Sequence, residues 1–322
     1  MNSLSLAADS TMLNTPVLEG IWAAVHTPFR TDFSLDEEGI TRNVTYFADA
    51  IKLQGIFFNG LFGEHWSLSV AERKRIVEVA VRAAGGRIAL SPNCTHHSLN
   101  ETIDLAHHAQ STGCDYVVLM NPATGPRGEE ELFTWFMSVA DRLTSDLFIF
   151  NSPVAGYALS GRLVARLATS GRFKVLKSAG GSHEVNEARR LAGDKIIVSD
   201  PSEGTWLGNL IIHGQKLLYA DAEPFLFQTE GNRPMVRMFE AYKAGELAQA
   251  LEIYRSLAPM RRVYEEWVSS QVRHGIMPCA AIKLWAERRG LAAGPVRPPL
   301  SPLHREDSQR LAQILDALEV KS

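Results

Sequence analysis

The fold is decided by the stretch Ser67–Gly85, SLSVAERKRIVEVAVRAAG, which lies between two short apolar runs. Ser69 with Glu72 three residues later is the pattern of a capping box, and Gly85 is a typical helix end. Between these ends apolar residues recur at helical spacing. The stretch therefore predicts a helix that joins two strands.

The same alternation of strand and helix continues along most of the chain. A second helix is predicted at SLNETIDLAHHAQSTG, where Ser98 and Glu101 form the start and Gly113 the end. Eight apolar runs, which begin every 21–35 residues, predict strands at Ile21–Val25, Ile56–Phe58, Ile88–Leu90, Tyr116–Leu119, Leu147–Phe150, Val175–Leu176, Ile196–Val198 and Leu217–Ala220. Strands that alternate with helices in this way form a parallel sheet.

Eight strand-and-helix units favour a closed (β/α)8 TIM barrel, because eight is the number that closes such a sheet. A doubly wound open sheet is the competing fold. That fold usually carries a glycine-rich GxGxxG turn after its first strand, whereas here the first strand is followed by HTPFRTD. We therefore predict the barrel.

Three regions are expected along the chain. Residues 1–16 lack the basic start and apolar core of a signal peptide and are interpreted as a mostly disordered lead-in. Residues 17–235 are expected to form the barrel. Residues 236–322 are expected to form a C-terminal helical extension, with a proline-rich turn at AAGPVRPPLSP.

Composition narrows the class of protein. The 322 residues are 45% hydrophobic and 21% charged, as in ordinary globular proteins, and the net charge of −3 argues against nucleic acid or an anionic membrane surface as a partner. Cys94, Cys114 and Cys279 are too few and too scattered for a disulfide framework. No apolar run approaches the ~18 residues that a membrane span needs. A cytoplasmic location is expected.

In a TIM barrel the active site lies where the strands end. The polar residues at the predicted strand ends are therefore the candidates: His26, Thr27, Asn59, Glu64, His65, Asn93, Thr95, His96, His97, Asn121, Asn151, Ser152, Lys177, Ser178, Asp200, Asp221 and Glu223.

Lys177 is the most informative of these candidates, because it lies at the end of the buried strand in FKVLKSAGG. Burial in an apolar barrel mouth favours the neutral form of an amine, which can attack a carbonyl carbon. The alternative is a lysine that is paired with a carboxylate on a neighbouring strand.

The turn NGLFGEHW, with Gly60 and Gly63 around Leu61 and Phe62, is a second candidate. Such a turn can present successive backbone N–H groups to an anion such as a carboxylate. An ordinary strand-to-helix turn is the alternative.

A metal centre is the third possibility, with His26, His65 and His96 as ligands and Asp200 or Asp221 as a fourth. No HxH or HxxxH pair supports it, and His107 and His108 fall within a predicted helix. We therefore expect neither a metal nor any other cofactor.

Five segments, in order, resemble the dihydrodipicolinate synthase/N-acetylneuraminate lyase family of Schiff-base aldolases. GIWAAVHTPF resembles its first strand, NGLFGEHWSLSVAER its Gly-x-x-Gly-Glu loop, and FNSP its Tyr-Asn-x-Pro element. VLKSAGG resembles the segment with the Schiff-base lysine, and GPVRPPLSPL resembles the C-terminal turn. The resemblance covers the chain from about Gly20 to about Pro302.

This resemblance implies a barrel with a C-terminal helical domain, usually assembled as a homotetramer, a dimer of dimers. It also implies class I aldolase or lyase chemistry on a 2-oxo acid such as pyruvate, through an imine on Lys177. Implied substrate-binding residues are Thr27, Gly60, Leu61, Phe62, Asn151 and Ser178.

The chain also departs from the family pattern. Phe150 stands where most members have a proton-relaying tyrosine, NPATGP replaces a tyrosine pair, and NSPVAGYALS lacks the arginine that grips a carboxylate in the synthases. The lysine-biosynthesis reaction is therefore disfavoured. Another group must move protons, and the candidates are His26, His65, His96, Asp221, Glu223 or a bound water.

Three functions remain open from the sequence. The first is a lyase or aldolase, including a hydratase-aldolase, with a non-standard proton relay and an apolar aldehyde partner. The second is a catalytically impaired barrel that binds a small 2-oxo acid as a sensor or scaffold. The third is a metal-dependent lyase.

Overall fold

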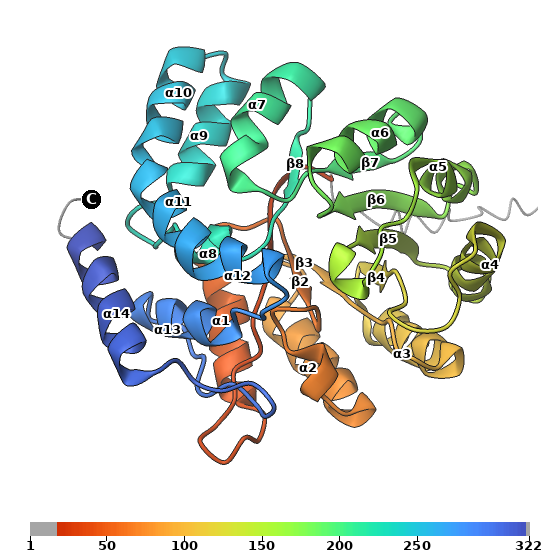
Figure 1. Ribbon diagram of the computed structural model, residues 1–322, viewed down its shortest axis with the longest axis horizontal. Helices are drawn as coiled ribbons and strands as arrows, with labels where there is room; N and C mark the ends of the chain where they lie inside the picture. Colours follow the sequence, from red (N-terminus) through yellow and green to blue (C-terminus); the bar gives the residue numbers. More distant parts are fainter. Residues whose placement is uncertain (1–17, 320–322) are drawn as a thin grey trace, which may run out of the picture.

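The computed structural model describes residues 18–319, in which eight parallel strands alternate with helices and form a (β/α)8 barrel (Figure 1). Every apolar run that predicted a strand overlaps a strand, so the predicted fold class is confirmed. The strands are β1 (Gly20–Ala24), β2 (Gly55–Phe58), β3 (Ala89–Pro92), β4 (Tyr116–Met120), β5 (Asp146–Asn151), β6 (Phe173–Ser178), β7 (Ile197–Ser199) and β8 (Leu217–Tyr219). The expected lead-in, residues 1–16, lies outside the described residues.

Backbone hydrogen bonds join the strands into two ladders, with the orders β3-β2-β1-β8 and β4-β5-β6-β7. Between β3 and β4 the barrel closes through a parallel bridge that pairs Asn93 with Val118. Between β7 and β8 hydrogen bonds from a side chain, that of Ser199, replace the backbone hydrogen bonds of a ladder. Ser199 Oγ accepts the amide of Tyr219 at 2.9 Å and donates to the carbonyl of Leu217 at 3.1 Å.

Helices surround the barrel and begin as the sequence pattern predicts. At Ser69 the capping box is formed in both directions, and Gly85 ends the helix in the left-handed conformation, with φ at 52°. The helices of the barrel are α1 (Glu37–Asp49), α2 (Val70–Ala84), α3 (Leu99–Thr112), α4 (Glu129–Ala140), α5 (Gly161–Thr169), α6 (Ser182–Ala192), α7 (Glu203–His213) and α8 (Glu223–Leu226).

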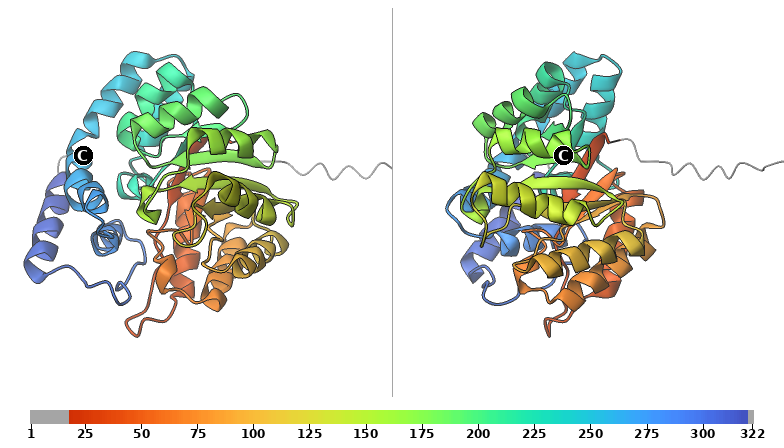
Figure 2. Two further views of the ribbon diagram at one scale, coloured as in Figure 1. Left: turned by 45° about the vertical axis from the view of Figure 1, so that its right-hand side comes forward. Right: turned by 90° about the vertical axis from the view of Figure 1, so that its right-hand side faces the viewer.

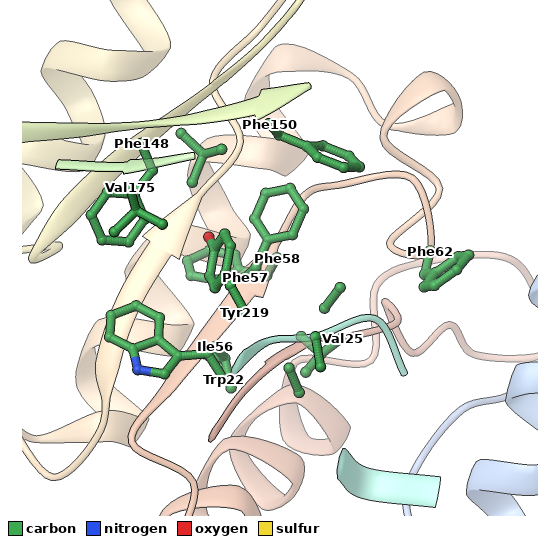
Figure 3. Packing of buried hydrophobic residues seen from close by; sticks show 14 of the residues in the cluster. Trp22, Val25, Ile56, Phe57, Phe58, Phe62, Phe148, Phe150, Val175 and Tyr219 are labelled. Carbon is green, nitrogen blue, oxygen red and sulfur yellow. The ribbon is translucent and has the colours of Figure 1, made fainter. Parts of the chain in front are cut away.

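The interior of the barrel is filled by aromatic rings. Trp22 lies between Tyr116, Phe148 and Tyr219, with ring centroids 5.7–5.8 Å apart. Figure 3 shows Trp22 with Phe148 and Tyr219. A Cβ atom on Gly55 would lie 2.2 Å from the Trp22 ring, so this strand position needs glycine. The core is therefore closed below the strand ends, which leaves the site at the carboxyl edge of the barrel.

The C-terminal helices gather on one side of the barrel (Figure 2). They are α9 (Pro234–Lys243), α10 (Leu247–Ser256), α11 (Ala258–Tyr264), α12 (Ser270–Arg273), α13 (Cys279–Arg288) and α14 (Arg305–Glu319), with a π-helical turn at Glu265–Ser269. The domain boundary expected between residues 235 and 236 falls inside α9. Within residues 18–319, none of the helices is both long and apolar enough to cross a membrane.

Candidate active site

Lys177 lies near the end of β6 and is fully buried. Its Nζ donates to Asp221 Oδ1 at 2.7 Å and to the carbonyl of Ala220 at 2.8 Å, both of which directly follow β8. The alternative that the sequence left open, a lysine paired with a carboxylate, is therefore present. The pair does not exclude an imine, because the Asp221 side chain remains about one third exposed and both residues line a cavity.

Three aromatic rings surround the amine. Nζ of Lys177 lies 5.1 Å from the ring centroid of Phe150, 5.5 Å from that of Phe57 and 5.6 Å from that of Tyr219. Figure 3 shows these three rings close together. The ring of Phe150 has no hydroxyl, so it cannot transfer a proton to or from the amine.

Glu223, another predicted relay residue, is the first residue of α8 and is buried. Burial and, to a smaller extent, the neighbouring charge of Asp221 raise the pKa of Glu223 to about 8. Glu223 does not line the cavity that contains Lys177. Of the five predicted relay residues, Asp221 alone contacts the amine.

The loop after β2 brings Leu61 and Phe62 to the same cavity. Asn59 and Glu64, on either side of this pair, adopt left-handed backbone conformations with φ of 54° and 55°. Within residues 18–319 no hydrogen-bond acceptor is found for the amides of Leu61 and Phe62. The amides of Leu61 and Phe62 therefore have no partner within the described chain, in a loop that lines the cavity of Lys177.

Two predicted substrate-binding residues support this loop instead of facing the cavity. Thr27 Oγ1 donates to the carbonyl of Gly63 at 2.8 Å. Gly60 lies against the Phe57 ring, and a Cβ atom added to Gly60 would be only 2.8 Å from that ring. Both residues hold the backbone of the loop in place.

The C-terminal region clamps the same loop from the other side. Lys283 Nζ, on α13, lies 2.6 Å from Glu64 Oε1, and the amide of Arg297 donates to Glu64 Oε2 at 2.9 Å. Cys279 Sγ lies 3.9 Å from the carbonyl of Leu61 and 4.0 Å from that of Phe62. Because these carbonyls face Cys279, the clamp also orients the amides of the loop.

Sequence reasoning missed this clamp. The signal was present, since Lys283 is a charged residue in the apolar helix segment AAIKLWA.

The cavity encloses about 460 Å³ including its open mouth. Apart from Lys177, Asp221 and Ser152, its lining is apolar: Ala24, Phe57, Leu61, Phe62, Phe150, Pro153, Val154, Ala179, Val272 and Met277. Val272 and Met277 come from the C-terminal region, which the sequence did not place at the site.

Asn151 and Ser178, at the ends of β5 and β6, do not line this cavity. Asn151 holds Leu159 in place, because its side chain accepts the Leu159 amide at 2.8 Å and donates to the Leu159 carbonyl at 3.3 Å. Ser178 Oγ is buried and has no hydrogen-bond partner within the described chain.

The three histidines proposed as relay residues lie elsewhere. His26 Nε2 is 2.7 Å from the carbonyl of Ala292, and burial lowers the pKa of His26 to about 4. His65 and His96 line a different cavity, together with Arg73 and Thr124, and burial lowers the pKa of His65 to about 4. A proton relay from these histidines to Lys177 is therefore not supported by their positions.

The residues suggested for a metal centre are also separated. Asp200 is engaged by the hydroxyl of Thr205 at 2.9 Å and by the amide of Ser202 at 3.1 Å. In the part of the chain that the structure describes, no three His, Cys, Asp or Glu side chains are grouped as metal ligands.

A buried lysine whose amine borders a cavity at the mouth of a TIM barrel is suited to form an imine with a carbonyl substrate, as the lysines of class I aldolases and lyases do. The family model described as the Dihydrodipicolinate synthetase family matches residues 17–318. The chain belongs to this family, and the protein is a class I aldolase or lyase.

Similar proteins agree with this assignment. The 4-hydroxy-tetrahydrodipicolinate synthase of Methanopyrus kandleri is 30% identical over 302 residues, which cover 91% of this chain and 94% of the relative. That of Methanothrix thermoacetophila is 29% identical, with 93% of this chain and 96% of the relative covered. The crystal structure of the Escherichia coli K12 prophage protein YagE in complex with pyruvate has the same fold, with a TM-score of 0.82, 24% identity and coverage of 94% and 99%.

Proposed function

We propose that the protein is a lyase or aldolase that binds a 2-oxo acid such as pyruvate, or its aldol adduct, as an imine on Lys177. The observation that carries this proposal is the contact of 2.7 Å between Lys177 Nζ and Asp221 Oδ1 at the wall of an otherwise apolar cavity. The free amides of Leu61 and Phe62 would bind the carboxylate of the acid.

Asp221 would move the protons that a tyrosine moves in most relatives. It takes a proton from the Lys177 ammonium, and the free amine attacks the keto carbon. A proton then passes from the attacking nitrogen to the new alkoxide, which gives the carbinolamine. The protonated Asp221 then gives its proton to the departing hydroxyl, so that water leaves and the iminium forms.

The same carboxylate would serve the carbon chemistry. Asp221 removes a proton from the carbon next to the iminium, which becomes an enamine. The enamine attacks the aldehyde, and Asp221 returns the proton to the new alkoxide. Water then releases the product from Lys177, and the lyase direction follows the same steps in reverse.

The lining of the cavity supports an apolar partner for the 2-oxo acid. Leu61, Phe62, Val272 and Met277 bring aliphatic and aromatic surface to the cavity, and the lining includes no arginine or histidine. A second carboxylate or a chain of sugar hydroxyls would lose hydration there without gaining partners. An aliphatic or aromatic aldehyde is therefore proposed over a sugar and over an aldehyde that carries a carboxylate, as in the synthase reaction.

One observation favours a second function, a barrel that binds a 2-oxo acid without turnover. The position of the family tyrosine is held by Phe150, whose ring lies over the amine without a proton to give. Under this second function Lys177 still forms the imine, but Asp221 is only its counter-ion. Release of pyruvate from an aldol adduct separates the two functions.

Assembly as a homotetramer and a cytoplasmic location remain proposals from the family resemblance. Light scattering at micromolar concentration tests the first proposal. A species near the chain mass of 35.6 kDa would contradict it.

The proposed function is tested by incubating the protein with a panel of 2-oxo acids, reducing with borohydride and measuring the intact mass. We expect the mass of one reduced oxo acid on the wild-type protein and no addition on Lys177→Ala. Lys174→Arg is a matched control, because Lys174 lies on the same strand but pairs with Asp146 away from the cavity. Absence of any adduct on the wild type would overturn the proposal.

A further inference from the structure

Three acidic residues, Asp221, Glu203 and Glu223, lie near one another beyond β8, and among the described residues only two cations pair with them. Asp221 is paired with Lys177. Glu203, the first residue of α7, is fully buried and accepts two hydrogen bonds from the guanidinium of Arg261, at 2.6 and 2.8 Å. Glu223 has no cation of its own within the described chain.

Glu223 is also poorly solvated by the protein. One carboxyl oxygen, Oε1, accepts a long hydrogen bond of 3.5 Å from the amide of Glu203, and the other, Oε2, is buried without a partner within normal hydrogen-bond distance. A buried carboxylate without a cation and with one weak donor is unfavourable, whereas the neutral acid is tolerated. The raised pKa of Glu223, about 8, agrees with this charge balance.

The C-terminal helix α11 supplies two groups around Glu223. Arg261 and Tyr264 are three residues apart and so lie on one face of the helix. Ala222 lies between Asp221 and Glu223 in the chain, and its amide donates a hydrogen bond to the Tyr264 hydroxyl at 3.3 Å. The proton of this hydroxyl therefore points away from the Ala222 amide. Burial and, next, the charges of Glu223 and Asp221 raise the pKa of Tyr264 well above its ordinary value, so its hydroxyl stays protonated.

We propose that Glu223 is a neutral carboxylic acid behind Asp221, because it is buried with no cation of its own in the described chain, and that its neutrality allows Lys177 to be released as a free amine. Arg261 neutralises Glu203 and Lys177 neutralises Asp221. Glu223 is the remaining carboxyl of the three and is the one that keeps its proton. Tyr264 is neutral, whereas a cation at the same position would favour the ionised form of Glu223. Glu223 does not line the cavity, so it acts through its charge, which sets how firmly the proton is held on Lys177.

The consequence concerns the first step of imine formation and rests on the proposed function. With Glu223 neutral, the ammonium of Lys177 faces one carboxylate, to which it passes its proton when the amine attacks. With Glu223 ionised, two negative charges attract the same ammonium and hold its proton on nitrogen. The groups that act on Glu223 are Asp221, Glu203, Lys177, Tyr264 and, through Glu203, Arg261.

The pH dependence of imine formation tests the proposal, measured as the initial rate of borohydride trapping with pyruvate. In the wild type the rate should fall above pH 8, by roughly tenfold at pH 9, because about one Glu223 in ten then remains neutral. Glu223→Gln copies the shape of the neutral acid and cannot ionise. Its trapping rate should not fall in this range, so that the ratio of variant to wild type rises about tenfold between pH 7 and pH 9.

A direct readout accompanies the rates. Infrared difference spectra of wild type against Glu223→Gln should show a protonated carboxyl band that disappears near pH 8. In Tyr264→Phe the loss of the hydroxyl removes a donor that can stabilise ionised Glu223, so the pH at which trapping falls should move upward. A merely structural role of Tyr264 would leave that pH unchanged.

The failures of the two proposals are distinguishable. If the wild type forms no imine at any pH, the proposed function fails. If the imine forms but wild type and Glu223→Gln have parallel pH profiles, or the carboxyl band is absent at pH 7, the neutral Glu223 is refuted and the proposed function stands.

Discussion

Two buried lysine–carboxylate pairs lie at the same end of the barrel, and they differ in access. Lys177 and Asp221 are 2.7 Å apart, and the side chain of Asp221 is 33% exposed to the cavity. Lys283 and Glu64 are 2.6 Å apart, and their side chains are only 2% and 0% exposed. The chemistry of the two pairs is nearly identical, so their surroundings must decide what each can do.

The Lys283 pair is closed on every side. Lys283 also donates to the carbonyl of Pro295 at 2.7 Å and lies 4.2 Å from the ring centroid of Phe29, while Glu64 accepts the amide of Arg297. Burial lowers the pKa of Lys283, yet no carbonyl substrate can reach its amine. Of the two pairs, only that of Lys177 has a carboxylate that opens onto space for a substrate, which is what the proposed imine needs.

The largest effect is expected for Asp221→Asn, which keeps the size of the side chain but removes its charge and its capacity as a base. Loss of a positioned acid or base costs about 10²–10⁴-fold in rate. We expect a loss in this range in pyruvate release from an aldol adduct. Asp146→Asn is the matched control, because Asp146 is 34% exposed and pairs with Lys174, which lies on β6 as Lys177 does. Equal activity of the two variants would reduce Asp221 to a counter-ion.

A comparable effect, but on stability, is expected for Lys283→Met. Removing one partner leaves Glu64 as a buried, uncompensated charge, which costs about 3–5 kcal/mol of the free energy of unfolding. Arg288→Met, which breaks the exposed pair with Asp316, should cost at most about 1 kcal/mol. Urea unfolding measures both variants, and equal midpoints would show that the closed pair is not a clamp.

A smaller effect on stability is expected from the buried histidines. The pKa of His26 and that of His65 are lowered to about 4 in the folded protein, whereas an unfolded histidine titrates near 6.5. Between these values the unfolded chain binds more protons, so the free energy of unfolding falls as the pH falls. At pH 5 each histidine should cost about 2 kcal/mol relative to pH 7.

Urea unfolding at pH 7 and pH 5 checks this expectation, with His26→Gln as the comparison. The variant should lose part of the pH dependence. An unchanged pH dependence would show that His26 does not titrate on unfolding.

The smallest effect is expected for Phe150→Tyr. If Asp221 relays protons, a tyrosine here adds little, and its hydroxyl costs roughly 1–3 kcal/mol where it finds no partner in the apolar cavity. We expect pyruvate release to be unchanged or reduced up to about tenfold. A large gain from near zero would instead identify a barrel that binds without turnover.

The strands, the helix caps and the lysine were predictable because each depends on local sequence. Periodicity placed all eight strands, and the pattern of Ser69 and Glu72 placed the start of α2. The position of Lys177 at a strand end followed from the same periodicity. These features need no knowledge of distant contacts.

The partners of the site were less predictable, because they depend on contacts between residues far apart in the chain. Lys283 reaches Glu64 across more than 200 residues, and Val272 and Met277 reach the cavity from the C-terminal region. His26 follows a strand, as expected, but its ring is held by the carbonyl of Ala292 outside the cavity. Position at a strand end therefore selects candidates, and the direction of each side chain decides among them.

The most direct test of the account compares the two buried lysines within one experiment. Wild-type protein is incubated with pyruvate and borohydride, digested, and the modified peptides are identified by mass spectrometry. We expect the label on the peptide with Lys177 and none on the peptide with Lys283. A label on Lys283, or no label on Lys177 in folded protein, would contradict it.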